Sequence, residues 1–222
     1  LNLKIHEESV NTAYGWPAGI HNHSLQGGYS KKDWFTKGNI SRNAFGGFIG
    51  NAIDRDYQWH PKTQYLASAL IGVDKNTVSA HYRTDLLSEN VYNPGVAINK
   101  IASDQNYFTN RWMHQMQLDK KMNKNLGINA AMAYTHFSRQ IQSTTFDTRT
   151  NDRRLSVAPG SQDTNKINGW MTRVLLAWKL NNKMNITSGL DINIENGSGG
   201  RIVNGKQKIQ DYGVITSADI KL

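Results

Sequence analysis

Residues 167–180 read INGWMTRVLLAWKL, and their side chains alternate in character from one position to the next. The even positions are mostly apolar and include Trp170 and Trp178, whereas the odd positions carry Arg173 and Lys179. A period of two is typical of a β-strand with one apolar face. Because strands of soluble proteins usually end after about five or six residues, the length of this segment favours a strand that crosses a membrane.

The two tryptophans fit the two interfaces of a membrane. Trp170 and Trp178 lie on one face and are eight residues apart, which is about 27 Å at ~3.4 Å per residue. In a strand tilted by about 40°, this becomes roughly 21 Å along the membrane normal, close to the ~25 Å apolar band between the aromatic girdles of outer-membrane barrels. A slip of one residue would turn Arg173 toward lipid at a cost of about 2 to 4 kcal/mol near the midplane. An amphipathic strand of a large soluble sheet is the alternative for this segment taken alone.

Composition allows a membrane barrel and argues against several other classes. The chain has 222 residues, is 38% hydrophobic and carries a formal net charge of +9. No run of about 18 apolar residues is present, so a transmembrane helix is not expected. Low average hydropathy is compatible with a barrel, since only alternate residues of each strand face lipid. Cysteine is absent, so nothing indicates disulfides or thiolate chemistry.

The positive charge does not predict nucleic-acid binding. The basic residues form no cluster longer than a pair, such as Lys120-Lys121, and no base-stacking motif is present. We therefore expect a basic surface that faces anionic lipid or an anionic ligand.

Alternating segments recur along almost the whole chain, and the connections between them differ in length. Short connections are expected after residues 31, 74, 120 and 181, and long loops over residues 46–61, 90–106, 147–165 and from 196. Outer-membrane barrels have short periplasmic turns and long extracellular loops, whereas soluble sandwiches have no reason to place every long loop at one end. The predicted fold class is therefore all-β, an antiparallel up-and-down transmembrane β-barrel, with about ten strands in this chain.

This assignment orients the chain and its polar face. We expect Trp34, Asp74, Lys120 and Asn182 near the periplasmic rim, and Asp56, Pro94, Arg153 and Gly199 outside. The residues expected to point into the lumen are Arg83, Asp85, Arg111, Gln115, Asp119, Arg173, Asp191 and Glu195. Such a polar lumen is either a water channel or filled by other protein, and its charges should pair.

The external loops contain the candidate ligand-binding residues. They combine aromatic surfaces with guanidinium donors, which suit a planar or anionic ligand. The candidates are Arg55, Tyr57, Trp59, Arg149, Arg153 and Arg154. Tyr92 and Tyr107 flank another loop, where an aromatic girdle is the simpler interpretation.

Nothing in the sequence predicts catalysis, a metal site or a cofactor. His21 and His23 share a strand face and His60 lies in a loop, but no third histidine or carboxylate follows at the spacing of a metal site. Asp54, Asp56 and His60 are similar to the acid and histidine groupings of barrel proteases, although acidic residues in loops are commonly just solvated. We expect no enzyme.

One stretch carries a family resemblance. Residues 22–35, NHSLQGGYSKKDWF, continue through residues 38–41 to residues 45–48, and this run resembles the barrel of TonB-dependent outer-membrane receptors. The resemblance implies a 22-stranded barrel closed by an N-terminal plug, with energy delivered through a TonB box. Neither the plug nor the box is found here, and the chain begins at Leu1 without a signal peptide. Residues 1–222 are therefore expected to be a single partial β-barrel segment, with the plug domain absent from this chain.

The resemblance also implies a function, a location and partners. It implies import of a scarce nutrient such as a ferric siderophore, haem or cobalamin, or an oligosaccharide, across the bacterial outer membrane. The implied partners are TonB through the missing N-terminal part, a small-molecule ligand, outer-membrane lipid and lipopolysaccharide, and a surface lipoprotein. No ligand residue of the family can be carried over, because the contacts lie in variable loops and in the plug. A complete small barrel acting as a protease and a passive porin are the alternatives.

Overall fold

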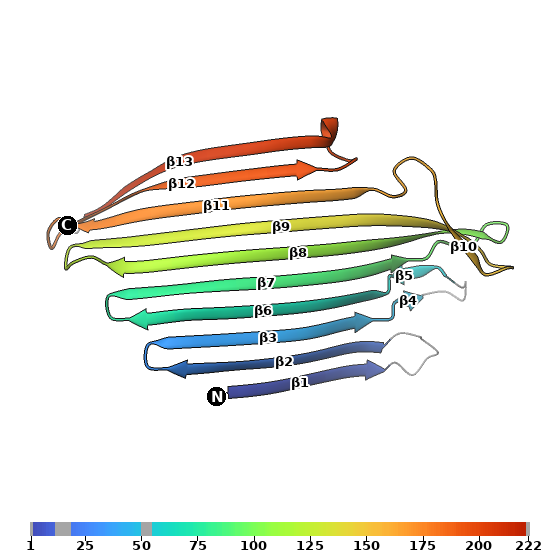
Figure 1. The fold of residues 1–222 in the computed structure, drawn as a ribbon, viewed down its shortest axis with the longest axis horizontal. Coiled ribbons are helices and arrows are strands. Elements are labelled where there is room, and N and C mark those ends of the chain that lie inside the picture. The colour runs from blue at the N-terminus through green and yellow to red at the C-terminus, as the bar shows by residue number, and fades with distance from the viewer. Residues whose placement is uncertain (1, 12–18, 50–54, 221–222) are drawn as a thin grey trace.

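A computed structural model describes residues 2–11, 19–49 and 55–220, with side chains described from residue 19 onward, and shows one long, curved antiparallel sheet (Figure 1). Ten strands follow one another in the sheet as β1-β2-β3-β6-β7-β8-β9-β11-β12-β13. Each strand pairs with its neighbour along this path in antiparallel register, and β1 and β13 are the two edges. The predicted all-β, up-and-down arrangement is confirmed; the sheet does not close on itself.

The strands are long, as expected. The main strands are β1 (Asn2–Asn11), β2 (Gly19–Lys31), β3 (Trp34–Phe45), β6 (Lys62–Lys75), β7 (Val78–Asn93), β8 (Ile101–Lys121), β9 (Leu126–Asp147), β11 (Thr164–Lys179), β12 (Met184–Ser198) and β13 (Lys206–Ile220). Short strands β4 (Phe48–Ile49) and β5 (Tyr57–Trp59) pair with each other, and β10 (Asp152–Leu155) pairs with β9. A single 3₁₀ turn, η1 (Val203–Gly205), precedes β13. Among the residues that the structure describes, no helix is long and apolar enough to cross a membrane.

Tight turns join the strands at one end of the sheet, as the sequence predicts (Figure 1). Asn123 and Asn181 stabilise two of these turns through their side-chain oxygens, which accept backbone N–H groups of the following residues. Lys32 adopts a φ of 54° in the turn between β2 and β3. The described parts of the long loops lie at the opposite end of the strands (Figure 1).

The second long loop is shorter than predicted. The sequence suggested residues 90–106, but β7 runs to Asn93 and β8 begins at Ile101, with Asn93 opposite Gln105. Residues 94–100 alone form the connection. The polar residues at these strand ends obscure the alternation, yet their backbone groups still pair with the neighbouring strand. β9, in contrast, continues well past Arg139 and reaches Asp147.

One face of the sheet is apolar and uncovered, and we call it the outer face. Across β9, β11 and β12, Trp170 lies between Tyr134 and Ile194. Within the described chain no second layer covers β11, because 42% of Trp170 and 55% of Trp178 are exposed, with Val174 and Leu176 between them at 37% and 46%. The soluble-sheet alternative requires a layer over this face, and none is present in that part of the molecule.

Aromatic rings form a chain across four strands of the outer face. The ring centroids of Tyr82 and His114 are 6.1 Å apart, those of His114 and Tyr134 are 6.2 Å apart, and those of Tyr134 and Trp170 are 6.0 Å apart. Trp112 also contacts His114 edge to face. Such a belt is typical of the interface level of a membrane barrel.

The opposite face, which we call the inner face, carries the charges that the sequence assigned to a lumen. The predicted pairing is confirmed for two pairs on this face. Arg83 donates to Asp85 on the same strand at 2.7 to 3.0 Å, and Arg173 pairs with Asp191, its register partner on β12. Arg111 and Glu195 have no ion pair with any residue the structure places.

The most buried residues lie at the loop ends of β8 and β9. Asp104 is fully buried there, together with Ala102, Ile141, Ser143 and Phe146. Loops fold over this region, whereas the rest of the sheet has solvent-accessible faces. The most buried side chains of the described chain are therefore found outside the part of the sheet that would cross a membrane.

Candidate functional site

Asp104 is the centre of a polar cluster that joins three loops. Its Oδ1 accepts hydrogen bonds from Arg55 Nη2 and from the Gly95 backbone N–H, the latter at 3.2 Å. Its Oδ2 accepts from Tyr92 Oη at 2.7 Å and from Arg153 Nη1 at 2.7 Å. Arg153 Nη2 also donates to the Tyr92 hydroxyl at 3.2 Å. The buried carboxylate is thereby fully hydrogen-bonded.

Phe146 lies under both arginines. The guanidinium carbons of Arg55 and Arg153 are 4.7 and 4.3 Å from the centroid of the Phe146 ring. These distances are within the range of cation–π contacts, which strengthen when water is excluded. Phe146 faces Arg153 in the β9–β10 register and Ala102 in the β8–β9 register. The cluster therefore has an aromatic base and a carboxylate at its centre.

The charges around Asp104 keep it ionised. Burial acts to raise the pKa of the Asp104 carboxyl, but the hydrogen bonds from Arg55 and Tyr92 and the charge of Arg55 outweigh burial and hold that pKa below its ordinary value of 3.8. In turn, the hydrogen bond from Arg153 to Tyr92 raises the pKa of Arg153. The cluster holds two guanidinium charges against one carboxylate, so it retains a net positive charge.

Gly95 is required at its position by close packing. A Cβ atom there would lie 2.2 Å from the carbonyl oxygen of Ser103, which is too close for any other residue. This approach lets the Gly95 N–H reach Asp104 and lets its carbonyl accept from Arg55 Nε at 3.1 Å. The absence of a side chain thus allows the 94–100 connection to lie against β8.

Two of the six predicted ligand-binding residues, Arg55 and Arg153, are brought together in this cluster. They come from the loop between β3 and β6 and from the hairpin of β9 and β10. Arg55 donates to Asp104 and to the Gly95 carbonyl, and Arg153 donates to Asp104 and Tyr92. The sequence did not single out Asp104 or Phe146, and nothing in their local pattern marks them. Arg55 and Arg153 each lie 49 residues from Asp104. Phe146 lies on β9, whereas Arg55 comes from the loop between β3 and β6.

The other four predicted residues lie around the cluster and not in it. Arg149 donates to Asp147 at 3.1 Å, which lowers the pKa of Asp147, and Arg154 donates to Asp152 at 2.8 Å. The Trp59 side chain is 69% exposed and contacts the rings of Phe45 and Phe48. Tyr57 packs beside Gly47, where a Cβ atom would lie 2.6 Å from its ring. Of the four, Trp59 and the two arginines are open to solvent.

The inner face near the loops holds a second basic and aromatic group. Arg139 lies over the ring of Tyr107, with 5.0 Å between the guanidinium carbon and the ring centroid. Arg111 is exposed on the same face, opposite Phe137 in the register of β8 and β9. The sequence placed Arg111 in the lumen but interpreted Tyr107 as a girdle residue. The register instead puts Tyr107 on the inner face, because it is opposite Ile141, an even number of residues from Phe137.

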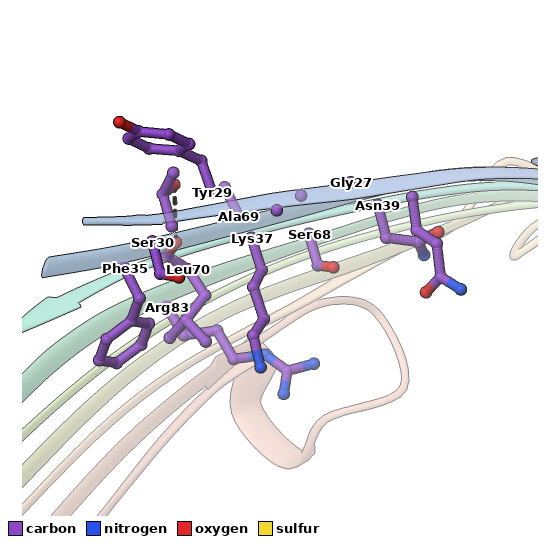
Figure 2. A pocket seen from close by; sticks show the side chains of 14 residues that line it. Gly27, Tyr29, Ser30, Phe35, Lys37, Asn39, Ser68, Ala69, Leu70 and Arg83 are labelled. Atoms are coloured by element: carbon purple, nitrogen blue, oxygen red, sulfur yellow. Dashed lines mark hydrogen bonds between the residues drawn. The ribbon is translucent and has the colours of Figure 1, made fainter. Parts of the chain in front are cut away.

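A groove on the first strands shows how sharply the two faces differ (Figure 2). Tyr29 points to one side of the sheet, whereas Lys37, Leu70 and Arg83 point to the other. The register aligns Lys37 with Leu70 and Leu70 with Arg83 across β3, β6 and β7. The inner face is thus basic along this row as well.

For His21, His23 and His60, and for Asp54, Asp56 and His60, the sequence predicts neither a metal site nor a protease site. Asp54 lies outside the described residues. In the part that is described, no three metal-binding side chains gather, and Asp56 is exposed. His60 Nδ1 is buried and has no hydrogen-bond partner there.

Several solved structures have an architecture similar to that of this chain. No protein-family model and no curated protein matches the sequence. Among solved structures, the ferric yersiniabactin uptake receptor FyuA from Yersinia pestis matches with a TM-score of 0.52 and 8% identity, over 96% of this chain and 37% of the receptor. The ferric citrate transporter FecA matches with 0.54 and 11%, over 90% and 33%. The ferric preacinetobactin receptor BauA from Acinetobacter baumannii matches with 0.53 and 10%, over 97% and 40%.

The chain has the barrel fold of these receptors. The predicted resemblance to the barrel of TonB-dependent receptors is therefore confirmed for the fold. The chain spans well under half the length of each of the three. That residues 1–222 are a single partial barrel segment, with the plug domain absent from this chain, stays a prediction.

Proposed function

We propose that this chain is part of an outer-membrane receptor barrel that imports a scarce nutrient with energy supplied through TonB. The observation that carries the proposal is the long-stranded sheet with an uncovered apolar face and a charged opposite face, in the fold of ferric-siderophore receptors. A ferric siderophore is the leading ligand, and haem, cobalamin or an oligosaccharide are variants. The plug, the TonB box and a surface lipoprotein partner belong to the proposal.

Ligand recognition is assigned to the loop end of the barrel. Arg149, Arg154 and Trp59 are open to solvent and offer guanidinium donors and an aromatic surface. Arg55 and Arg153 act by holding their loops on Asp104, and so they position the recognition surface. Arg111 and Arg139 on the inner face provide cations further along the path of an anionic ligand.

Uptake of radiolabelled ferric siderophores by cells that express the intact protein tests the proposal. We expect accumulation against a gradient for at least one member of a panel, and its loss when a protonophore collapses the proton gradient or when TonB is deleted. Haem, cobalamin and oligosaccharides extend the panel.

The alternatives predict different results. A passive porin would equilibrate small solutes regardless of the protonophore, and a protease would cleave a peptide library. Uptake that is insensitive to both treatments would contradict the receptor function.

A further inference from the structure

Charged residues are segregated between the two faces of the sheet. From β2 to β13, the pairing register places every strand carboxylate except Asp104 on the inner face, including Asp85, Asp191 and Glu195. Asp104 is buried by its arginines. Accessible charges on the outer face of these strands are therefore all positive.

Three outer-face lysines gather where β11, β12 and β13 approach the long loops. Lys166 is opposite Ser198, and Ser198 is opposite Lys206, so the two lysines are two strand spacings apart, about 10 Å. Lys208 follows on the same face of β13, opposite Asn196. Each lysine is exposed, and none has an ion-pair partner among the residues with assigned positions.

The three lysines lie just beyond the aromatic belt. Lys166 is four residues from Trp170 on β11, and Lys208 is four residues from Tyr212 on β13. In strands tilted by about 40°, four residues correspond to roughly 10 Å along the membrane normal. The headgroup layer on each side of a bilayer is about 5 to 8 Å thick, so ammonium groups at this distance reach lipid phosphates.

Unpaired like charges at this spacing repel one another unless an anion lies between them. The surrounding outer-face residues are neutral hydrogen-bonding groups, among them Ser138, Asn168 and Ser198. Asn168 accepts from Tyr134 and is bonded to His136, which fixes its orientation beside Lys166. The patch thus combines positive charge with neutral polar groups and has no competing carboxylate.

We propose that Lys166, Lys206 and Lys208 form a binding site for the phosphate groups of a phosphorylated glycolipid, of the lipid A class, in the outer leaflet. This inference rests on the proposed outer-membrane location. The lysines bind the phosphates, and the apolar side chains between Trp170 and Trp178 contact the acyl chains. A site of this kind fixes the barrel to its neighbouring lipids at one side.

Native mass spectrometry of the intact protein in detergent, with added diphosphoryl or monophosphoryl lipid A, tests the site. We expect the diphosphoryl form to bind more tightly, and the variant K166Q/K206Q/K208Q to bind it about tenfold more weakly or worse. The matched control K75Q/K120Q removes outer-face lysines at the opposite ends of the strands and should change binding by less than about twofold.

Several results would overturn the inference. These are equal binding by the triple variant and the unaltered protein, equal binding of the two lipids, or complete displacement of the lipid by inorganic phosphate. If the triple variant fails to fold, two other measurements test the site. One is the comparison of the two lipids on the unaltered protein, and the other is binding of diphosphoryl lipid A by the single variant K166Q. Siderophore uptake with unselective lipid binding would refute this site alone, whereas selective lipid binding without any uptake would refute the receptor function alone.

Discussion

Asp104 shows how a single buried carboxylate organises loops that are distant in sequence. It accepts four hydrogen bonds, three from residues of three different connections and one from Tyr92 at the end of β7. Because both of its oxygens are satisfied, its burial is compatible with its charge. The loops near the candidate ligand surface are therefore held together by electrostatics as much as by packing.

Asp104→Asn should loosen these loops. The amide keeps the shape but loses the charge, which leaves Arg55 and Arg153 facing each other over Phe146 without a counter-ion. We expect a local loss of about 1 to 3 kcal/mol, measured as faster hydrogen exchange in residues 147–155. The control Asp152→Asn breaks an exposed pair with Arg154 and should have little effect. Unchanged exchange in the Asp104 variant would contradict the role of the cluster.

Acid should open the same loops. The folded-state pKa of Asp104 lies below its ordinary 3.8, so the folded state binds fewer protons than the unfolded state near that pH. The stabilisation is complete above the unfolded-state pKa and disappears as the pH falls through the lowered pKa of the folded state. Limited proteolysis of the loops from pH 7 to pH 2 should show an acid transition in the unaltered protein that Asp104→Asn lacks.

At the level of the strand, β11 illustrates how alternation determines the environment of each side chain. Val174 is on the outer face between Ala130 and Leu190, while Arg173 pairs with Asp191 on the other face. Shifting β11 by one residue would exchange these environments. The Arg173–Asp191 pair and the apolar outer face therefore favour the same register.

Val174→Arg should impair membrane assembly. An arginine on the outer face near the midplane costs about 2 to 4 kcal/mol in a membrane barrel. Asn129→Arg is a matched control, since Asn129 is opposite Leu175 at nearly the same depth on the inner face and its side chain contacts Asp119. Heat-dependent migration of folded protein from outer-membrane fractions measures assembly. Equal assembly of the two variants would show that the outer face does not contact lipid.

For the whole molecule, the sheet has two unlike faces, and this predicts that side chains on the outer face are less accessible to water than side chains on the inner face. The chain has no cysteine, so single introduced cysteines report on one position each. In outer-membrane vesicles, Leu190→Cys should resist a water-soluble maleimide because lipid covers it. Asn193→Cys, on the inner face of the same strand, should react if the lumen holds water, and should be protected if a plug fills it. Reaction of Leu190→Cys as fast as in the unfolded protein would contradict a membrane location.

The alternation of residues 167–180, the spacing of the tryptophans and the order of short and long connections were sufficient to predict the antiparallel sheet, its two faces and its barrel class. These features are local or periodic, and a period of two is visible in the chain itself. The same face assignment put Arg173 and Asp191 on the charged face, where charges were expected to pair, but it did not predict which residues would meet. The length of the second loop was overestimated, because polar residues at the strand ends mask a pairing that depends on the neighbouring strand.

Only the tertiary structure showed that Arg55 and Arg153 bind Asp104, that Tyr107 lies on the inner face beside Arg139, and that Lys166, Lys206 and Lys208 meet on the outer face. Each of these groupings joins residues from different strands or loops. Contacts of this kind depend on the register of several strands and on the path of the loops over them. A single strand's sequence determines which side chains share its face, but the assembled sheet decides which side chains of other strands they meet.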